Sequence, residues 1–130
     1  MKTKAMKALI FIFCLCLSPI LTAQNTNQNK IQEAMANYDY ETAIELINKE
    51  KPTIPLLMQQ AKALKGIGNN AEALRVIRQV ITADSTNQQV HIEAAECCKA
   101  MAKYNDALDY YRKTITLNPK NKYARLQFIN

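Results

Sequence analysis

The hydrophobic residues near the C-terminal end of the chain recur with the spacing of one helical face. Five of them lie at successive steps of three, one, three and four residues: Tyr104, Ala107, Leu108, Tyr111 and Ile115. This spacing predicts an amphipathic α-helix. The same layout occurs about 34 residues earlier, in four counterparts: Ala73, Leu74, Ile77 and Ile81. A fixed period of this length is typical of stacked helical repeats, in which each unit covers the apolar face of its neighbour.

The pattern continues toward the N-terminus with a shorter period. The interval from Ala43 to Ala73 is four positions shorter than the interval from Ala73 to Ala107. Apolar residues at helical spacing flank a break near 37–39, so we expect a pair of helices there. Pro52 is expected to stop the second of these helices, because proline cannot continue the backbone hydrogen-bond ladder.

Capping residues and glycines mark the other helix boundaries. Thr53 is a suitable N-cap for the helix that follows it. The two glycines of the chain, Gly66 and Gly68, fall at the next turn, where a glycine permits the left-handed conformation that ends a helix. Farther along, Thr86 and Gln89 have the spacing of a capping box.

The predicted elements are six helices in three hairpins, followed by a short helix at 122–130. No stretch alternates apolar and polar residues as a strand would. The sequence therefore predicts an all-α fold, an α-solenoid of about three helix–turn–helix hairpins plus a short C-terminal helix. Its domain would span 24–130, with repeats at approximately 27–52, 54–87 and 88–121.

The segment 1–23 has the layout of a secretory signal peptide. Three lysines precede an uncharged apolar run at 8–17, which Ser18 and Pro19 break, and Ala23 supplies a small residue before the cut. Ten apolar residues are few for a membrane-spanning helix. We therefore expect an exported protein of a bacterial periplasm, with no membrane span after signal cleavage. The alternative is an uncleaved membrane anchor.

The charge of the chain depends on this segment. The whole chain has 17 Lys and Arg against 11 Asp and Glu, a formal net charge of +6. Removing the three lysines of the signal leaves 14 − 11 = +3 for the mature chain. A charge of this size is ordinary for a domain and predicts no nucleic-acid partner.

Between Ile54 and Pro119 the residues resemble the tetratricopeptide repeat, a helix–turn–helix unit of about 34 residues. Family positions that favour small residues hold four alanines, two in each repeat: Ala61, Ala73, Ala95 and Ala107. The family's large apolar position later in the second helix holds Ile77 and Tyr111. The usual tryptophan of the first helix is replaced by Leu57 and His91.

The resemblance implies a non-catalytic scaffold that binds a protein or peptide in a concave groove lined by the first helix of each repeat. The groove positions of the family correspond to eight residues: Met58, Lys62, Lys65, Gln89, Ile92, Glu93, Glu96 and Lys99. They mix both charges with two apolar contacts and do not match the lysine and asparagine clamp with which some members hold a C-terminal carboxylate. The alternative is that these residues form only a solvated helix face.

The residues that could carry chemistry are few. The single histidine, His91, lies seven residues before Cys98, about 10 Å along a helix and beyond hydrogen-bond reach. One histidine and two adjacent cysteines are too few for a metal site. We expect no enzyme activity, cofactor or metal. The alternative function is a thiol-based redox or metal-capturing factor that uses Cys97 or Cys98.

The C-terminal end is apolar, with Tyr123, Leu126, Phe128 and Ile129 close together. Terminal repeats normally present a polar outer face. Either this segment folds back over the third repeat, or the end of the stack stays exposed and favours a homodimer through this end. An exposed end also fits a chain that is the N-terminal fragment of a larger repeat-containing sensor or assembly protein.

Overall fold

The computed structural model describes residues 26–129 of the chain. The predicted signal peptide at 1–23 lies outside the described residues. Within 26–129 the chain forms only helices and turns, which confirms the prediction of an all-α fold. A helix over 26–36 is followed by six others: α2 (Tyr40–Ile47), α3 (Ile54–Gly66), α4 (Asn70–Ala83), α5 (Gln88–Ala100), α6 (Tyr104–Leu117) and α7 (Lys122–Ile129).

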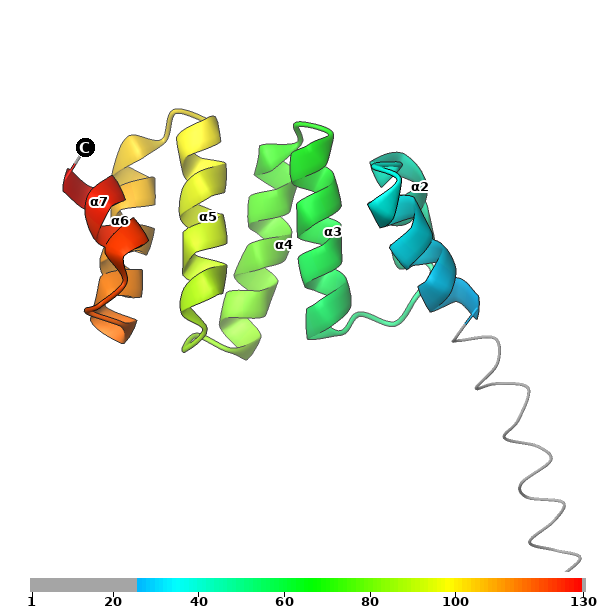
Figure 1. Cartoon of the computed structure of the whole chain (residues 1–130), viewed down its shortest axis with the longest axis horizontal. Coiled ribbons are helices and arrows are strands. Elements are labelled where there is room, and N and C mark those ends of the chain that lie inside the picture. Colours follow the sequence, from blue (N-terminus) through cyan, green and yellow to red (C-terminus); the bar gives the residue numbers. More distant parts are fainter. Residues whose placement is uncertain (1–25, 130) are drawn as a thin grey trace, which may run out of the picture.

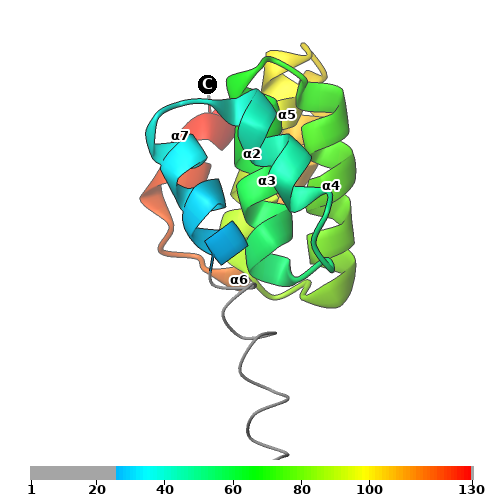
Figure 2. The same ribbon diagram turned by 90° about the vertical axis from the view of Figure 1, so that its right-hand side faces the viewer.

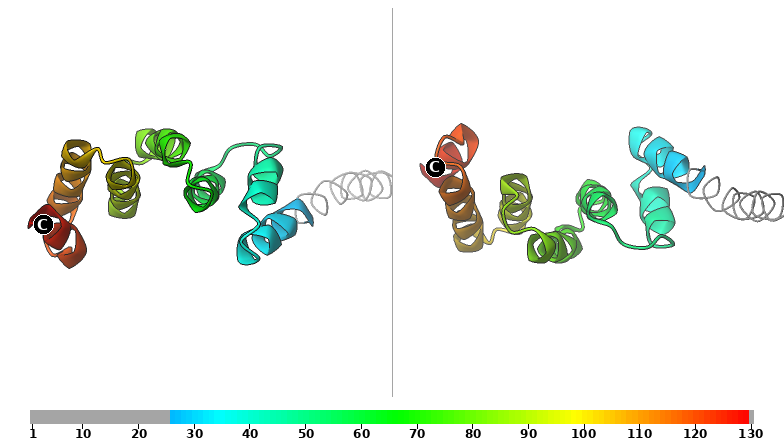
Figure 3. Two further views of the ribbon diagram at one scale, coloured as in Figure 1. Left: turned by 90° about the horizontal axis from the view of Figure 1, so that it is seen from above. Right: turned by 90° about the horizontal axis from the view of Figure 1, so that it is seen from below.

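The helices stand side by side in a row, as the solenoid prediction requires (Figure 1). Seen along that row, successive helices overlap and form two layers (Figure 2). Figure 3 shows the helix at 26–36, α3, α5 and α7 on one side of the row, and α2, α4 and α6 on the other. Both ends of the row turn toward the first side, so the first helices of the hairpins line the concave face.

The core is continuous along most of the row but divided at its N-terminal end. One large cluster joins α3, α4, α5, α6 and α7, and its largest fully buried side chains include Ile77, Val80 and Tyr111. The first hairpin contacts α3 through two smaller clusters. One holds Ile31 and Ile47 with Leu56, and the other holds three alanines: Ala34, Ala43 and Ala63. Small residues at this crossing let the helices approach closely.

The three hairpin turns share one backbone conformation but not one residue type. The left-handed residue is Tyr38 (φ 61°) in the first turn, Gly68 (φ 80°) in the second and Ala102 (φ 56°) in the third. The residue after it bonds in every case to a carbonyl five residues back, at 2.8–2.9 Å. The role predicted for Gly68 is therefore confirmed, whereas Gly66 stays inside α3. A Cβ at Gly66 would overlap the ring of Tyr40 on α2, so this glycine allows a close approach.

Two predicted helix boundaries were wrong. α2 ends at Ile47, well before Pro52, because Asn48 caps it in a tight turn. The N-cap of α5 is Asn87, whose side chain accepts from the backbone of Gln89, while Thr86 bonds instead to Asp84. The N-cap predicted at Thr53 is confirmed, since its hydroxyl accepts from the backbone of α3.

One residue of the α6 stripe is exposed, and two others, Leu108 and Ile115, are only partly buried. Tyr104 opens α6 and is 64% exposed, although Ala107 and Tyr111 on the same stripe are buried. Tyr104 lies in the first turn of its helix, where no helix covers its ring. The helical spacing predicted which face of α6 is buried. It could not show that this face is exposed in the first turn of the helix.

Candidate functional site

The predicted groove residues come from α3 and α5, the two central helices of the concave side (Figure 3). Between these helices lies a cavity of about 430 Å³. Its lining includes four of the eight predicted residues, together with Gln59 and Ala61: Met58, Lys62, Lys65 and Glu93. The cavity therefore lies between the two helices that carry the predicted groove residues.

An ion pair joins α3 to α5 beside this cavity. The Lys65 ammonium pairs with the Glu93 carboxylate, and both side chains are partly buried, with exposed fractions of 30% and 27%. The Gln89 side-chain amide also donates to Glu93, at 2.9 Å. Much of the Glu93 charge is therefore satisfied within the protein. The ammonium of Lys62, on an exposed position of α3, has no partner among the described residues.

Glu96 is bound inside the stack rather than left free in the groove. Its carboxylate accepts from the hydroxyl of Tyr111 on α6 and from that of Tyr123 on α7, the latter at 2.6 Å. Burial raises the pKa of Glu96, but these hydrogen bonds and the nearby charges of Lys99 and Lys65 outweigh burial and hold the pKa below its ordinary value. Burial and the Glu96 contact raise the pKa of Tyr111 in turn.

α7 extends the concave face beyond the predicted residues. Lys99 donates to the side-chain carbonyl of Gln127 on α7 at 2.6 Å, and Asn121 at the start of α7 donates to Gln88 at 2.9 Å. Tyr123 and Gln127 were missed as groove residues. The repeat period could have found them, since one further period carries the positions of Gln89 and Glu93 onto them.

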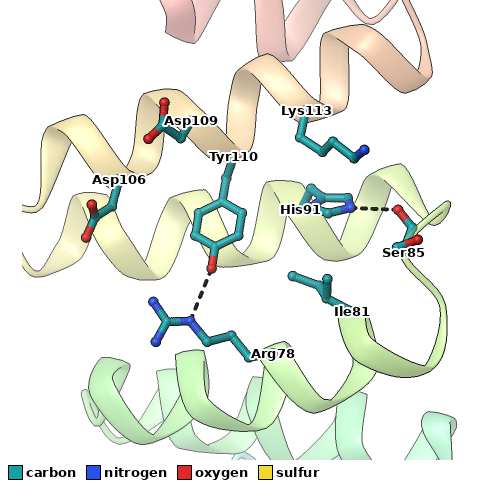
Figure 4. Close-up of a pocket in the computed structure, with 8 residues that line it drawn as sticks. All are labelled: Arg78, Ile81, Ser85, His91, Asp106, Asp109, Tyr110 and Lys113. Atoms are coloured by element: carbon teal, nitrogen blue, oxygen red, sulfur yellow. Dashed lines mark hydrogen bonds between the residues drawn. The ribbon is translucent and has the colours of Figure 1, made fainter.

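A second cavity, of about 450 Å³, lies on the opposite side between α4 and α6 (Figure 4). The hydroxyl of Tyr110 on α6 accepts from the Nε of Arg78 on α4 at 3.2 Å and so bridges the cavity. The lining holds two cations, Arg78 and Lys113, and two carboxylates, Asp106 and Asp109. Its net charge is zero, so this cavity favours no particular charge on a ligand.

His91 is buried at the wall of this second cavity, only 4% exposed. Its Nε2 lies 2.9 Å from the carbonyl oxygen of Ser85, which can only accept, so Nε2 carries the hydrogen (Figure 4). Its Nδ1 is buried without a hydrogen-bond partner, and the ring packs against Tyr110 with centroids 6.3 Å apart. His91 thus anchors the loop before α5 to the helix, a packing role.

Both described cysteines are buried and free. Cys97 and Cys98 are 0% exposed and belong to the main core cluster. Burial raises the pKa of the Cys97 thiol to about 11, and it also raises the pKa of Cys98. Because the thiolate is the reactive form, these cysteines are poorly placed for redox chemistry at neutral pH.

Two further features concern the described residues alone. Within 26–129 no group of three or more His, Cys, Asp or Glu side chains is arranged to hold a metal ion. None of the described helices combines the length and apolar character needed to cross a bilayer.

The chain is similar to several repeat proteins of known structure. MamA shares 17% identity with it at a TM-score of 0.72, over 80% of this chain and 63% of MamA. The first TPR of Spaghetti (RPAP3), bound to the HSP90 peptide SRMEEVD, shares 18% identity at a TM-score of 0.70, over 80% of this chain and 86% of that domain. PcrH, in complex with the chaperone binding region of PopB, shares 10% identity at 0.66, over 81% and 88% of the two chains.

At these identities the similarity shows a shared fold, and this chain spans less than two thirds of MamA. No curated protein sequence matches the chain. Residues 89–121, which comprise nearly all of α5 and α6, match the tetratricopeptide repeat family. The family match covers this one repeat, and the similarity to the solved structures shows that the chain shares their helical-repeat fold.

Proposed function

We propose that the protein is a non-catalytic interaction scaffold that holds a peptide segment of a partner protein on its concave face. The observation that carries this proposal is the cavity between α3 and α5, lined by Met58, Lys62, Lys65 and Glu93. Structural neighbours support it, because domains of the same fold were solved with an HSP90 peptide, an HSP70 peptide and a region of PopB bound.

The chemistry of the concave face fits binding better than catalysis. Its two carboxylates are engaged within the protein: Glu93 with Lys65, and Glu96 with two tyrosine hydroxyls. No histidine or cysteine lines the cavity. Without a nucleophile beside a base, the groove offers shape, apolar contact and charge, which are the elements of recognition.

Charge reversal at Lys62 tests the proposed groove. We expect the immobilised protein to retain partner proteins from an envelope extract, identified by mass spectrometry, and Lys62→Glu to lose them. Lys113→Glu makes the same charge change on the opposite face and should retain them. Equal capture by all three proteins would place the contact on another surface, and no specific capture by any of them would contradict a scaffold role.

We also propose that the protein is exported to a bacterial periplasm. The support is the sequence of 1–23, with its lysines, its apolar run and Ala23. Expression of the whole chain in a bacterium, followed by fractionation and intact-mass measurement, should yield a periplasmic protein that begins at Gln24. Ile10→Arg should block this export. Cytoplasmic wild-type protein of full mass would contradict the proposal, and a full-length membrane fraction would favour the anchor alternative.

The homodimer predicted from the apolar C-terminal end remains a proposal. Leu126 and Ile129 on α7 are 56% and 80% exposed. Sedimentation velocity of the mature chain should show a concentration-dependent dimer, which Ile129→Ser should weaken. A monomer at every concentration would contradict it.

A further inference from the structure

We infer that the outer face of α7, at the C-terminal end of the stack, binds the surface of an anionic phospholipid membrane. This inference goes beyond the proposed scaffold function, because it concerns the end of the stack and not its concave side. Three observations carry it: an exposed apolar face on the last helix, unpaired cations around that face, and an uneven distribution of charge along the stack.

The apolar face lies on the side of α7 that points away from the stack. Ala124 is fully buried in the main core, and Leu126 and Ile129 lie about opposite it on the helix, with exposed fractions of 56% and 80%. Tyr123 and Phe128 on the same helix are exposed as well. α7 is the last helix of the row, and no other described helix lies beyond it (Figure 1). Its apolar outer face is therefore uncovered within the described part of the chain.

Cations surround this apolar face. Lys122 lies on the same side of α7 as Leu126 and Ile129, at steps of four and three residues. Lys120 comes just before the helix and Arg125 lies within it, and all three cationic residues are exposed. None of the three forms an ion pair with another described residue. Their charges are therefore available to an anionic surface.

The distribution of charge along the stack turns the same end toward such a surface. Residues 110–129 contain five Lys and Arg and no Asp or Glu, a net charge of 5 − 0 = +5. Residues 26–53, at the other end of the row, contain three lysines and five carboxylates, a net charge of 3 − 5 = −2 (Figure 1). An anionic surface attracts the first end and repels the second, so its field orients the protein before contact.

A lipid surface suits this mixture of side chains better than a protein partner does. The core of a protein interface is depleted of charged residues, and Lys122, beside Leu126 and Ile129, would need a partner carboxylate there. At a membrane, the stem of a lysine lies along the apolar surface while its ammonium reaches the phosphates. Leucine and isoleucine side chains enter the boundary between headgroups and acyl chains, and each cation near an anionic surface adds about fivefold in affinity.

The homodimer proposed above uses the same face, so the two contacts exclude each other. In that dimer the cations of two copies would lie close together, whereas anionic lipid neutralises them. A head-to-tail contact with the acidic first hairpin has no apolar counterpart for α7, since Tyr38 is the one large hydrophobic residue exposed within 26–53. The lipid contact is therefore favoured over a second copy, and anionic vesicles should dissociate the dimer.

Vesicle flotation with the mature chain 24–130 tests the inference. We expect binding to vesicles of equal parts phosphatidylcholine and phosphatidylglycerol to be at least about tenfold tighter than to phosphatidylcholine alone, and to weaken as salt is added. Lys122→Glu and Leu126→Ser should each weaken it by about tenfold or more. Lys30→Glu and Ile67→Ser make the same changes at exposed positions elsewhere and should bind as the wild type does.

Fluorescence then tests whether α7 enters the lipid. The chain contains no tryptophan, so a single introduced one reports its own surroundings. In Ile129→Trp, anionic vesicles should move the emission to shorter wavelength, and brominated lipid should quench it. Ile67→Trp, at an exposed isoleucine in the α3–α4 turn, should show neither change. Circular dichroism confirms that each variant is folded, and Lys122→Glu keeps the test valid if Leu126→Ser is not.

Several outcomes would overturn the inference. These are no binding to either kind of vesicle, equal binding to both kinds, and anionic binding that neither Lys122→Glu nor Leu126→Ser weakens. An emission shift of Ile129→Trp that needs no vesicles and grows with protein concentration would replace the membrane with a second copy of the chain. None of these results bears on the concave groove, which Lys62→Glu tests separately.

Discussion

The first and third hairpins occupy equivalent places in the stack but are held very differently. α2 has 8 residues, whereas α6 has 14. The first hairpin contacts α3 through two small clusters and reaches the main core only through the partly buried Ile44, whereas the third belongs to the main core and is covered by α7. In a linear array each unit is stabilised only by its neighbours. The comparison therefore indicates that the N-terminal hairpin is the weaker end of the groove.

Replacing equivalent isoleucines with alanine should give the largest effect and tests whether the two ends of the stack differ in stability. Ile47 and Ile77 occupy the same position in the second helices of successive hairpins, and both are buried. Ile77→Ala removes a side chain from the main core and should cost about 2–5 kcal/mol of global stability. Ile47→Ala should reduce hydrogen-exchange protection mainly at 26–47. Equal loss of protection along the whole chain in both variants would show a single cooperative unit instead.

The labelling rate of the buried thiols reports separately on opening of the main core. Cys97 and Cys98 lie in the main core, and burial raises the pKa of both thiols. We expect slow reaction with a thiol reagent in the native protein, faster reaction in Ile77→Ala, and an unchanged rate in Ile47→Ala. Rapid labelling of the native wild-type protein would contradict the packing role and revive the thiol-based function.

The contact between Tyr40 and Gly66 joins the weak hairpin to the rest of the stack. Alanine normally stabilises a helix by about 1 kcal/mol relative to glycine. At Gly66, however, its Cβ would overlap the Tyr40 ring, so Gly66→Ala should destabilise the protein by about 1–2 kcal/mol. In a Tyr40→Ala background the same change should become stabilising. Chemical denaturation of the wild type, the two single variants and the double variant measures the coupling free energy between Tyr40 and Gly66.

The hairpin turns offer a smaller test of equivalence. Ala102 and Gly68 have the same left-handed backbone, which costs an L-residue about 1–2 kcal/mol. Ala102→Gly should therefore stabilise the third hairpin by about 1 kcal/mol, and Gly68→Ala should destabilise the second by a similar amount. Thermal unfolding measures both changes. Changes of the same sign in the thermal midpoints of the two variants would mean that the two turns are not equivalent.

The smallest effect is a pH dependence at the α5–α7 contact. The folded-state pKa of Glu96 lies below its ordinary value of 4.5, so its contribution is present above that value and is lost as the pH falls through the folded-state pKa. In Glu96→Gln the decline in stability between pH of about 5 and about 3 should be shallower. An unchanged slope would show that the two tyrosine contacts do not depend on the carboxylate charge.

Much of the fold could be predicted because its information is local and repeated. Apolar spacing placed the helices, and the regular period between Ala73 and Ala107 gave their stacking order. The end of α2 was misjudged because Pro52 is a strong local signal, whereas the helix ends earlier, in the tight turn at Asn48. Gly66 was assigned to a turn for the same reason, since only the folded chain brings Tyr40 beside it.

The candidate site was less predictable than the fold. The resemblance predicted a binding face, and four of its eight predicted residues, Met58, Lys62, Lys65 and Glu93, line one cavity. Sequence could not show which charges are already paired, because the partners of Glu96 come from α6 and α7, far along the chain. Pairing across helices is a tertiary property, and it decides which groups remain free to meet a ligand.

Methyl NMR during titration with a partner protein captured by the wild-type chain tests the central claim, that the concave face is the binding surface, most directly. The methyl signals of Met58 and Ile92, two of the predicted groove residues, should shift together and saturate at one stoichiometry, while the signal of Ile81, which lines the opposite cavity, should not move. Shifts confined to Ile81, with the two concave methyl signals unchanged, would contradict the account.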